Sequence, residues 1–394
     1  MSTANSDRWM LPEGMFEALP GQAQALESLR RELLDLFATW GYQYCMPPVV
    51  EHLDALLTGV GSTLERETFK LTDPAGGRLL GIRADMTTQA ARIDANRLGG
   101  EGINRLCYVG SVLRDAPANA HRSRNPTQVG AELFGADTPQ ADHETLRLMV
   151  ATLQQAGIKN LHVDIGHIGV YRAIINALGL SVEQAKPLYR LLQGRRVTEI
   201  HEYVKAAELD TEWQQIICTL PKLHGDIGVL DEARALLKSK APEALAAIDE
   251  LEAAAKLISA DASLSVHVDL IELRGYSYHT GLVFAALVPG VGSELARGGR
   301  YNSVGAAFGQ ARPATGFSAD LGAVFDASER ACGSAQSILA PAEATNESLQ
   351  AAIVALRADG ESVVEDVAGA QDAAAQNCDR VLKNIDGSWQ VTNA

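Results

Sequence analysis

Four polar residues could together form a binding site for a ligand that carries positive charge. Gln128 and Glu132 lie four apart in a segment with the composition of a strand, so both side chains point to one face. Asp85 and Thr87 add a second carboxylate and a hydroxyl. Rigidly held carboxylates and an amide suit a ligand with an ammonium group and a ring N–H. Taken alone, the same residues also fit a polar strand face with solvated carboxylates.

Two antiparallel strands are expected to position these groups, Arg105 to Arg114 and Gln128 to Gly135. The polar loop between them carries His121, Arg122 and Arg124. A helix capped by Thr87 or Thr88 and ending near Asn96 is expected to follow Asp85. Before it, Phe69 to Leu71 and Leu79 to Ile82 read as two strands joined by a polar turn.

The remaining pattern alternates antiparallel strands with helices and predicts an α+β fold. An amphipathic helix is expected from Gln22 to Trp40, because Leu26, Leu29, Leu33, Leu34 and Phe37 recur at helical spacing. A helix from about Asp142 to Gly157 and a strand from Leu161 to Ile165 follow. Residues from about 170 to 260 are almost wholly helical in pattern and predict an inserted helical subdomain. Strand character returns at Val266 to Leu273 and at Leu282 to Leu287.

The chain is expected to divide near residue 325. Residues 1–325 form the main domain, and residues 326–348, rich in Ala and Ser, are expected to be a linker. Residues 349–394 predict a small α/β unit with a helix at Leu349 to Ala358 and a strand at Ser362 to Val367. A terminal hairpin, Arg380 to Lys383 with Trp389 to Thr392, turns at Asp386-Gly387.

Composition argues against several classes of protein. The formal charge is −15, from 49 acidic against 34 basic residues, which disfavours a surface that grips nucleic-acid phosphates. The five cysteines are scattered and never in CxxC spacing, so no structural metal is expected. No run of about 18 apolar residues and no signal-peptide core occur, so no membrane span is expected and the cytoplasm is the expected location.

Several motifs resemble those of histidyl-tRNA synthetases, a class II aminoacyl-tRNA synthetase family. The stretch RLCYVGSVLRDAPANAHRSRNPTQVGAELFG resembles the second signature motif of that family, and Arg83-Ala84-Asp85-Met86-Thr87 resembles its RPEGT loop. Arg274 to His279, RGYSYH, resembles the RGLDYY signature. Four further segments match motifs of the family. They are LPEG with Leu19-Pro20, the Gly41 to Glu51 segment, GGRYN at 298–302 and GFSADLGAV at 316–324. The resemblance covers about residues 8 to 325 and implies a class II synthetase-like antiparallel sheet flanked by helices.

The resemblance implies a histidine site. Asp85 and Thr87 match the positions at the ammonium of the amino acid, with Gln128 and Glu132 nearby. Arg274 matches the arginine near the carboxylate, and Tyr278 the first of two paired tyrosines; whether His279 touches the ligand stays open. Arg114 matches an arginine that contacts the α-phosphate of ATP, and without ATP it could meet the histidine carboxylate or an internal acid.

The same comparison implies that ATP is not held. The family places an arginine where this chain has Ala323, an acid where it has Ala116, and an aromatic residue where it has Pro126. None of these three side chains can pair with a phosphate or stack on adenine. The C-terminal unit is also about half the length of the family's anticodon-binding domain.

A synthetase-like chain with these losses resembles the regulatory subunits of ATP phosphoribosyltransferase. That resemblance implies a non-catalytic protein, with no catalytic residues and no cofactor. It implies a short-form catalytic subunit as partner, self-association as a dimer within a hetero-octamer, and L-histidine as ligand, with no tRNA. The implied role is activation of the catalytic subunit and feedback inhibition by histidine in the first step of histidine biosynthesis.

Two alternatives remain at this stage. One is a truncated but active histidyl-tRNA synthetase-like ligase, which Arg114, Arg122 and Arg274 keep open. The other is a free-standing amino-acid-binding module that regulates a different partner. Histidine-dependent ATP–pyrophosphate exchange would identify the ligase, and a neighbouring gene for a short transferase would count against the module.

Overall fold

A computed structural model describes residues 9–58, 62–99, 101–115, 123–273, 275, 278–302, 304, 309, 311–332, 336–369 and 372–394. The chain divides into two compact units. The larger comprises Met1–Glu17 and Leu26–Arg330, and the smaller comprises Ala18–Ala25 and Ala331–Ala394. No helix in the described part of the chain is long and apolar enough to cross a membrane.

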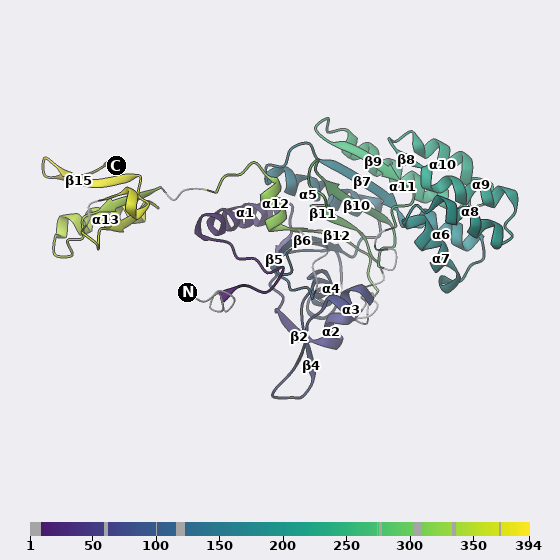
Figure 1. Cartoon of the computed structure of the whole chain (residues 1–394), viewed down its shortest axis with the longest axis horizontal. Coiled ribbons are helices and arrows are strands. Elements are labelled where there is room, and N and C mark those ends of the chain that lie inside the picture. Colours follow the sequence, from purple (N-terminus) through teal and green to yellow (C-terminus); the bar gives the residue numbers. More distant parts are fainter. Residues whose placement is uncertain are drawn as a thin grey trace, which may run out of the picture. The chain divides into compact units, whose positions relative to one another are not determined.

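A mixed sheet forms the centre of the larger unit (Figure 1). Its strand order is β1-β5-β6-β12-β11-β10-β7-β9-β8. The bounds are β1 Gln43–Tyr44, β5 Asn104–Ser111, β6 Thr127–Phe134, β7 His162–His167, β8 His224–Gly225, β9 Ser265–Asp269, β10 Leu282–Leu287, β11 Ala296–Arg300 and β12 Ala314–Asp320. Six neighbouring pairs are antiparallel, as the sequence predicts, while β1 with β5 and β7 with β9 are parallel.

Helices pack on one face of this sheet (Figure 1). They are α1 Pro20–Thr39, α5 Pro139–Gln155, α6 Ile168–Ala177, α11 Ala244–Ser259 and α12 Leu321–Ala327. In α1 the apolar stripe buries Leu29, Leu33 and Phe37, which confirms the predicted helix within two residues at its start. The Phe37 ring meets Phe317 of β12 edge-on at 6.2 Å. These helices cover one face of the sheet. The opposite face of β6, β11 and β12, which contains glycines, forms the site.

A small sheet and three helices lie between α1 and β5 in the sequence. The sheet has the order β2-β4-β3, with β2 Val50–His52, β3 Lys70–Thr72 and β4 Leu79–Ile82. The helices are α2 Leu53–Leu57, α3 Ser62–Glu67 and α4 Thr87–Arg97. The predicted cap of α4 is wrong, because Thr87 is its first residue and the N-cap is Met86. The Asp85 carboxylate instead accepts the Thr87 N–H at 2.7 Å.

Residues 168–259 are largely helical, as the sequence predicts. Between α6 and α11 lie α7 Val182–Gln193, α8 Val197–Ala206, α9 Thr211–Thr219 and α10 Val229–Leu237. A short 3-10 turn at Leu220–Lys222 and the two-residue strand β8 interrupt the helices. α7 begins with a capping box between Ser181 and Gln184, which satisfies N–H groups at its first turn. α7 also contributes Tyr189 and Gln193 to the wall of the site.

The smaller unit has a four-stranded sheet of order β14-β13-β15-β16 with one long helix. Its elements are β13 Ser337–Ala340, α13 Glu347–Ala358, β14 Ser362–Glu365, β15 Arg380–Ile385 and β16 Ser388–Asn393. The predicted helix, strand and hairpin are confirmed. The expected linker needs correction, because β13 lies inside residues 326–348 and is buried in the middle of the sheet. Its sequence, SILA, is too short to stand out from the Ala- and Ser-rich stretch around it.

Candidate functional site

Two glycines, Gly130 of β6 and Gly316 of β12, make room for polar groups on the open face of the large sheet. Glu132 of β6 is in register with Gly316 of β12. A Cβ at Gly316 would lie 1.6 Å from the Glu132 Oε2, so only glycine leaves space for the carboxylate. A Cβ at Gly130 would lie 2.6 Å from the Tyr108 hydroxyl. The two glycines therefore form the floor on which Glu132 and Tyr108 lie.

Glu132 is a carboxylate buried among tyrosines, with 1% of its surface exposed. The Tyr108 hydroxyl donates to its Oε1 at 2.8 Å, and the Tyr301 hydroxyl donates to its Oε2. Burial raises the pKa of Glu132 to about 8, although the two tyrosine hydrogen bonds act in the opposite direction. The group is therefore largely protonated at neutral pH until a positive partner favours its charged form.

Asp85 and Gln128 form a second polar cluster beside Glu132. The Asp85 Oδ2 accepts from the Gln128 Nε2 at 2.9 Å, and the Gln128 Oε1 accepts the Met86 N–H at 2.9 Å. The Thr87 hydroxyl lies 3.1 Å from the Tyr108 hydroxyl and so connects the two clusters. Four of the predicted residues, Asp85, Thr87, Gln128 and Glu132, thus come together in one hydrogen-bonded network.

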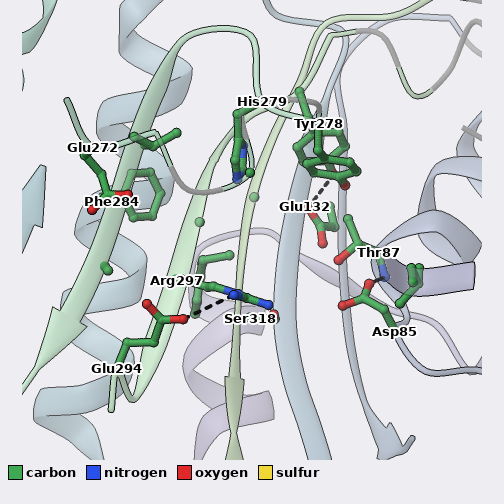
Figure 2. A pocket seen from close by; sticks show the side chains of 18 of the residues that line it. Asp85, Thr87, Glu132, Glu272, Tyr278, His279, Phe284, Glu294, Arg297 and Ser318 are labelled. Carbon is green, nitrogen blue, oxygen red and sulfur yellow. Dashed lines mark hydrogen bonds and ion pairs between the residues drawn. The ribbon is translucent and has the colours of Figure 1, made fainter. Parts of the chain in front are cut away.

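These groups face a cavity of about 580 Å³, called here the central cavity (Figure 2). Asp85 and Thr87 line one side, and Glu132 lines the sheet side. Glu272 and Glu294 line the far part of the cavity, beyond His279 in the view of Figure 2, and Arg297 lies below His279 next to Ser318. The volume exceeds what a single amino acid needs, and carboxylates outnumber cations among its described lining residues. Such a cavity favours a ligand with N–H donors and positive charge.

Tyr278 and His279 form part of the cavity wall. The Tyr278 ring stacks on Tyr301 with ring centroids 5.0 Å apart, and His279 meets Tyr278 edge-on at 5.2 Å. The Tyr278 hydroxyl is buried and has no hydrogen-bond partner among the described residues. Burial lowers the pKa of His279 to about 4, so its imidazole is neutral at pH 7 and can donate from Nδ1 to the Arg300 carbonyl at 3.2 Å.

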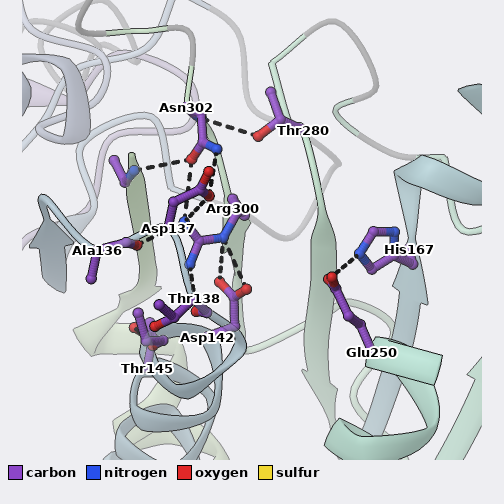
Figure 3. Close-up of polar contacts among 12 residues, drawn as sticks. Ala136, Asp137, Thr138, Asp142, Thr145, His167, Glu250, Thr280, Arg300 and Asn302 are labelled. Atoms are coloured by element: carbon purple, nitrogen blue, oxygen red, sulfur yellow. Dashed lines mark hydrogen bonds and ion pairs between the residues drawn. The ribbon is translucent and has the colours of Figure 1, made fainter. Parts of the chain in front are cut away.

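A buried ion pair fixes the end of β11 that carries Tyr301 (Figure 3). The Arg300 Nε donates to both carboxylate oxygens of Asp142 at 3.1 and 2.9 Å, and its Nη2 donates to the Thr138 carbonyl at 3.1 Å. The Arg300 carbonyl accepts the Thr280 N–H at 2.8 Å. The first turn of α5 and the segment after Tyr278 are therefore attached to the same residue.

One expected site residue, Arg114, lies apart from the network, and another, Arg274, is outside the described residues. Arg114 lines a smaller cavity of about 40 Å³ with Asp85, Pro126 and Gln128, and its Nε donates to the Ala84 carbonyl at 3.4 Å. Arg274 lies outside the described residues, as do Ala116, His121 and Arg122. Ala323 lies in the first turn of α12, where the Asp320 carboxylate accepts its N–H at 3.4 Å.

Sequence reasoning missed three residues of the site: Tyr108, Tyr301 and Arg297. Tyr108 is directly opposite Gly130 in the β5–β6 register, and Tyr301 ends the GGRY segment. A large polar aromatic facing a glycine across two strands is a signal that could have identified Tyr108. No group of three or more His, Cys, Asp or Glu side chains in the described part of the chain could hold a metal ion.

Comparisons with known proteins cover nearly the whole chain. Residues 14–324 match a family model described as histidyl-tRNA synthetase, and residues 335–392 match one described as the ATP phosphoribosyltransferase subunit HisZ C-terminal domain. A curated protein of Alkalilimnicola ehrlichii named ATP phosphoribosyltransferase regulatory subunit is 48% identical over 394 residues, which is 99% of this chain and 98% of that protein. One of Thioalkalivibrio sulfidiphilus with the same name is 47% identical over 393 residues, which is 99% of each.

Solved structures agree with the fold. One from Bacillus halodurans C, titled as an ATP phosphoribosyltransferase regulatory subunit/histidyl-tRNA synthetase, has a TM-score of 0.81 at 28% identity and covers 93% of this chain and 95% of its own. Histidyl-tRNA synthetase from Nostoc sp. PCC 7120 has a TM-score of 0.79 at 17% identity, covering 98% and 97%. At that identity the second likeness concerns the fold alone, and it agrees with the class II synthetase-like architecture predicted from the motifs.

Proposed function

Because the chain belongs to the family of ATP phosphoribosyltransferase regulatory subunits, we propose that its central cavity binds L-histidine and that this binding controls the catalytic subunit. The chain is a regulatory, non-catalytic component of that enzyme. The truncated-ligase alternative has no support from these relatives. Histidine is the end product of the pathway in which the resemblance places the enzyme, so its binding would serve as feedback.

The observation that carries the proposal is the hydrogen-bonded network from Asp85 to Tyr301. Asp85 and Thr87 offer oxygen atoms to the ammonium group of the ligand. Glu132 is held by two tyrosine hydroxyls at the cavity floor, where it can accept an imidazole N–H. Ligand binding would also give the Tyr278 hydroxyl a partner, since buried polar groups are almost always hydrogen-bonded. Gln128 supports Asp85, and Arg114 and Arg274 remain proposed histidine-binding residues from the resemblance.

The proposal needs histidine to bind two states of the enzyme with different affinity. A ligand shifts an equilibrium only by its difference in affinity between the states, and couplings of about 1–3 kcal/mol are typical. Thr280 and Tyr301 adjoin the cavity and connect through Arg300 to the start of α5. We propose that histidine binding shifts Tyr278 and Thr280 and that the change passes along this connection to the subunit interface.

The assembly is also part of the proposal. The partner is a short-form catalytic subunit, and this chain contributes as a dimer to a hetero-octamer. Exposed apolar side chains at Tyr44, Met46 and Val49, in the segment that resembles the first synthetase motif, support self-association. The charge of −15 supports a protein that does not bind tRNA, and the cytoplasm is the proposed location.

The test is a phosphoribosyl-ATP formation assay with a short-form catalytic subunit from the same source. We expect the rate to rise when this chain is added and to fall again as histidine is titrated in. Gly292→Ala serves as a control variant, because a Cβ there meets nothing within 4 Å. No effect on the rate or on histidine sensitivity would contradict the proposal. Histidine-dependent ATP–pyrophosphate exchange would then test the ligase alternative.

A further inference from the structure

The central cavity is strongly acidic for a site that must also accept a carboxylate. Five carboxyl groups line it, from Glu67, Asp85, Glu132, Glu272 and Glu294, of which Glu132 is largely protonated at neutral pH. Among its described lining residues Arg297 is the one Lys or Arg side chain, and His279 is neutral because burial lowers its pKa to about 4. An amino acid brings its own carboxylate, which such surroundings would repel unless a cation meets it. Among the described residues that line the central cavity, Arg297 is the one that can provide this cation.

Arg297 is well placed for that contact. It lies on β11, in register with Ser318 of β12 on one side and Ala285 of β10 on the other. Both neighbours are small, so the long side chain can extend over the sheet, and Figure 2 shows its guanidinium reaching towards Ser318. Arg297 also lines the smaller cavity beside Asp85 and Gln128. Arg297 therefore lines both cavities.

Glu294 holds the Arg297 side chain in place, while some N–H groups of the guanidinium remain available. Its Nη1 pairs with the Glu294 Oε1 at 3.2 Å, while 62% of its side chain stays exposed. Among the described residues this is the one side-chain partner of the guanidinium. A guanidinium has five N–H donors in a planar fork, so donors remain for two carboxylate oxygens. Glu294 orients the group, and the ligand can occupy the rest of the fork.

The distance to Glu132 suits an amino acid between them. Glu132 is in register with Gly316, and Arg297 with Ser318, so they are two strands and two residues apart. Strand spacing of about 4.8 Å and a rise of about 3.3 Å per residue put their Cα atoms about 12 Å apart. That gap accommodates both side chains and a ligand with an imidazole at one end and a carboxylate at the other.

We propose that Arg297 binds the α-carboxylate of the amino-acid ligand and makes the cavity selective for the intact amino acid over its decarboxylated amine. This inference rests on the proposed histidine site. Asp85 and Thr87 meet the ammonium group, Glu132 meets the imidazole, and Arg297 donates two N–H groups to the carboxylate. A bidentate guanidinium–carboxylate pair is among the strongest polar contacts that a protein makes.

Calorimetric titration with histidine and with histamine, which lacks the carboxylate, tests the assignment. The wild-type chain should bind histidine more tightly than histamine. Arg297→Met should weaken histidine binding about 10- to 100-fold, remove the preference, and leave histamine binding unchanged or tighter. Arg297→Lys should restore part of the preference, because the charge returns without the planar fork.

Two further variants make the result specific. Arg196→Met removes a matched guanidinium, since Arg196 is 59% exposed and pairs with Glu199 three residues away at 2.9 Å; it should change neither affinity. Arg274→Met tests the position that the family resemblance favours. If Arg297→Met keeps the preference, or if Arg274→Met alone abolishes it, the assignment of Arg297 is wrong while the histidine site stands. If the wild-type chain does not bind histidine, both the site and this inference fail.

Discussion

The rings of Tyr278 and Tyr301 stack at 5.0 Å with their planes inclined by 26°, yet their hydroxyls have different surroundings. The Tyr301 hydroxyl donates to the buried Glu132 carboxylate. The Tyr278 hydroxyl is buried without a partner among the described residues. One tyrosine thus maintains the cavity floor, and the other keeps a buried hydroxyl without a partner among the described residues.

The two tyrosines should therefore respond differently to loss of the hydroxyl. Tyr278→Phe removes a group with no partner in the described structure, so the free energy of unfolding should change by less than about 0.5 kcal/mol. Histidine affinity should fall by roughly 3- to 10-fold, the value of one ordinary hydrogen bond. Tyr301→Phe should instead destabilise the chain by about 1–3 kcal/mol, because Glu132 loses a buried donor. Denaturant unfolding with calorimetric titration measures both quantities; equal stability losses in the two variants would contradict this division.

Glu132 should give the chain an unusual dependence of stability on pH. Its pKa is raised to about 8 in the folded chain and is near 4.5 when unfolded, so the folded state binds more protons between these values. The contribution of Glu132 is full below about pH 4.5 and is lost as pH rises through 8. Relative to Glu132→Gln, the wild-type chain should lose up to about 1.4 kcal/mol of unfolding free energy per pH unit in this window. Parallel unfolding curves for the two proteins between pH 5 and 8 would show that Glu132 does not titrate there.

The space above Gly316 is predicted to be essential to the cavity. A Cβ at this position would lie 1.6 Å from the Glu132 carboxylate, so Gly316→Ala must displace it. We expect histidine affinity to fall at least about tenfold, the loss of a hydrogen bond to a charged group, and the melting temperature to drop. Gly292→Ala, where a Cβ meets no atom within 4 Å, should leave both within error. Unchanged binding by Gly316→Ala would mean that the carboxylate can relocate without consequence.

The sequence predicts several residues of this site, but it does not predict which strands bring them together. Gln128 and Glu132 could be placed on one strand face from their spacing, and the motif around Asp85 brought that residue to them. Tyr301 and Arg297 could not be placed in the same way, because their positions beside Glu132 depend on strand register between segments far apart in the chain. Glu132 opposite Gly316 spans 184 residues of sequence, and no local pattern specifies that pairing.

The buried pair of Arg300 and Asp142 should matter more to stability than exposed pairs do. Both side chains are less than 10% exposed, and Asp142→Asn would leave the guanidinium with the exposed Asp137, at 3.2 Å, as its remaining carboxylate. Breaking such a pair costs about 3–5 kcal/mol. Glu329→Gln breaks the exposed pair with Lys159, at 2.6 Å, and should cost less than about 1 kcal/mol. The two losses are compared by denaturant unfolding; similar values would mean that the other partners of Arg300 suffice.

Elements of the fold that depend on local sequence patterns could be predicted, whereas those that depend on contacts between distant segments could not. The helix α1 and the hairpin β15–β16 follow from apolar periodicity and from the Asp386-Gly387 turn, so both were predictable. The sequence of β13 does not predict a strand, because its four residues are apolar only in part and its pairing depends on neighbouring strands on both sides. The parallel pairing of β7 with β9 was likewise invisible, since about a hundred residues of helical insertion separate the two strands.

The strand order has a consequence for how the chain folds while it is being made. β6 ends at Phe134, but its neighbour β12 begins only at Ala314, 180 residues later. Ribosomes add about 5–20 residues per second, so one edge of β6 waits roughly 10–40 s for its partner. Helical segments between them can fold in the meantime from local contacts. Until β12 emerges, the backbone of β6 offers an unpaired edge with which a strand of another chain can pair.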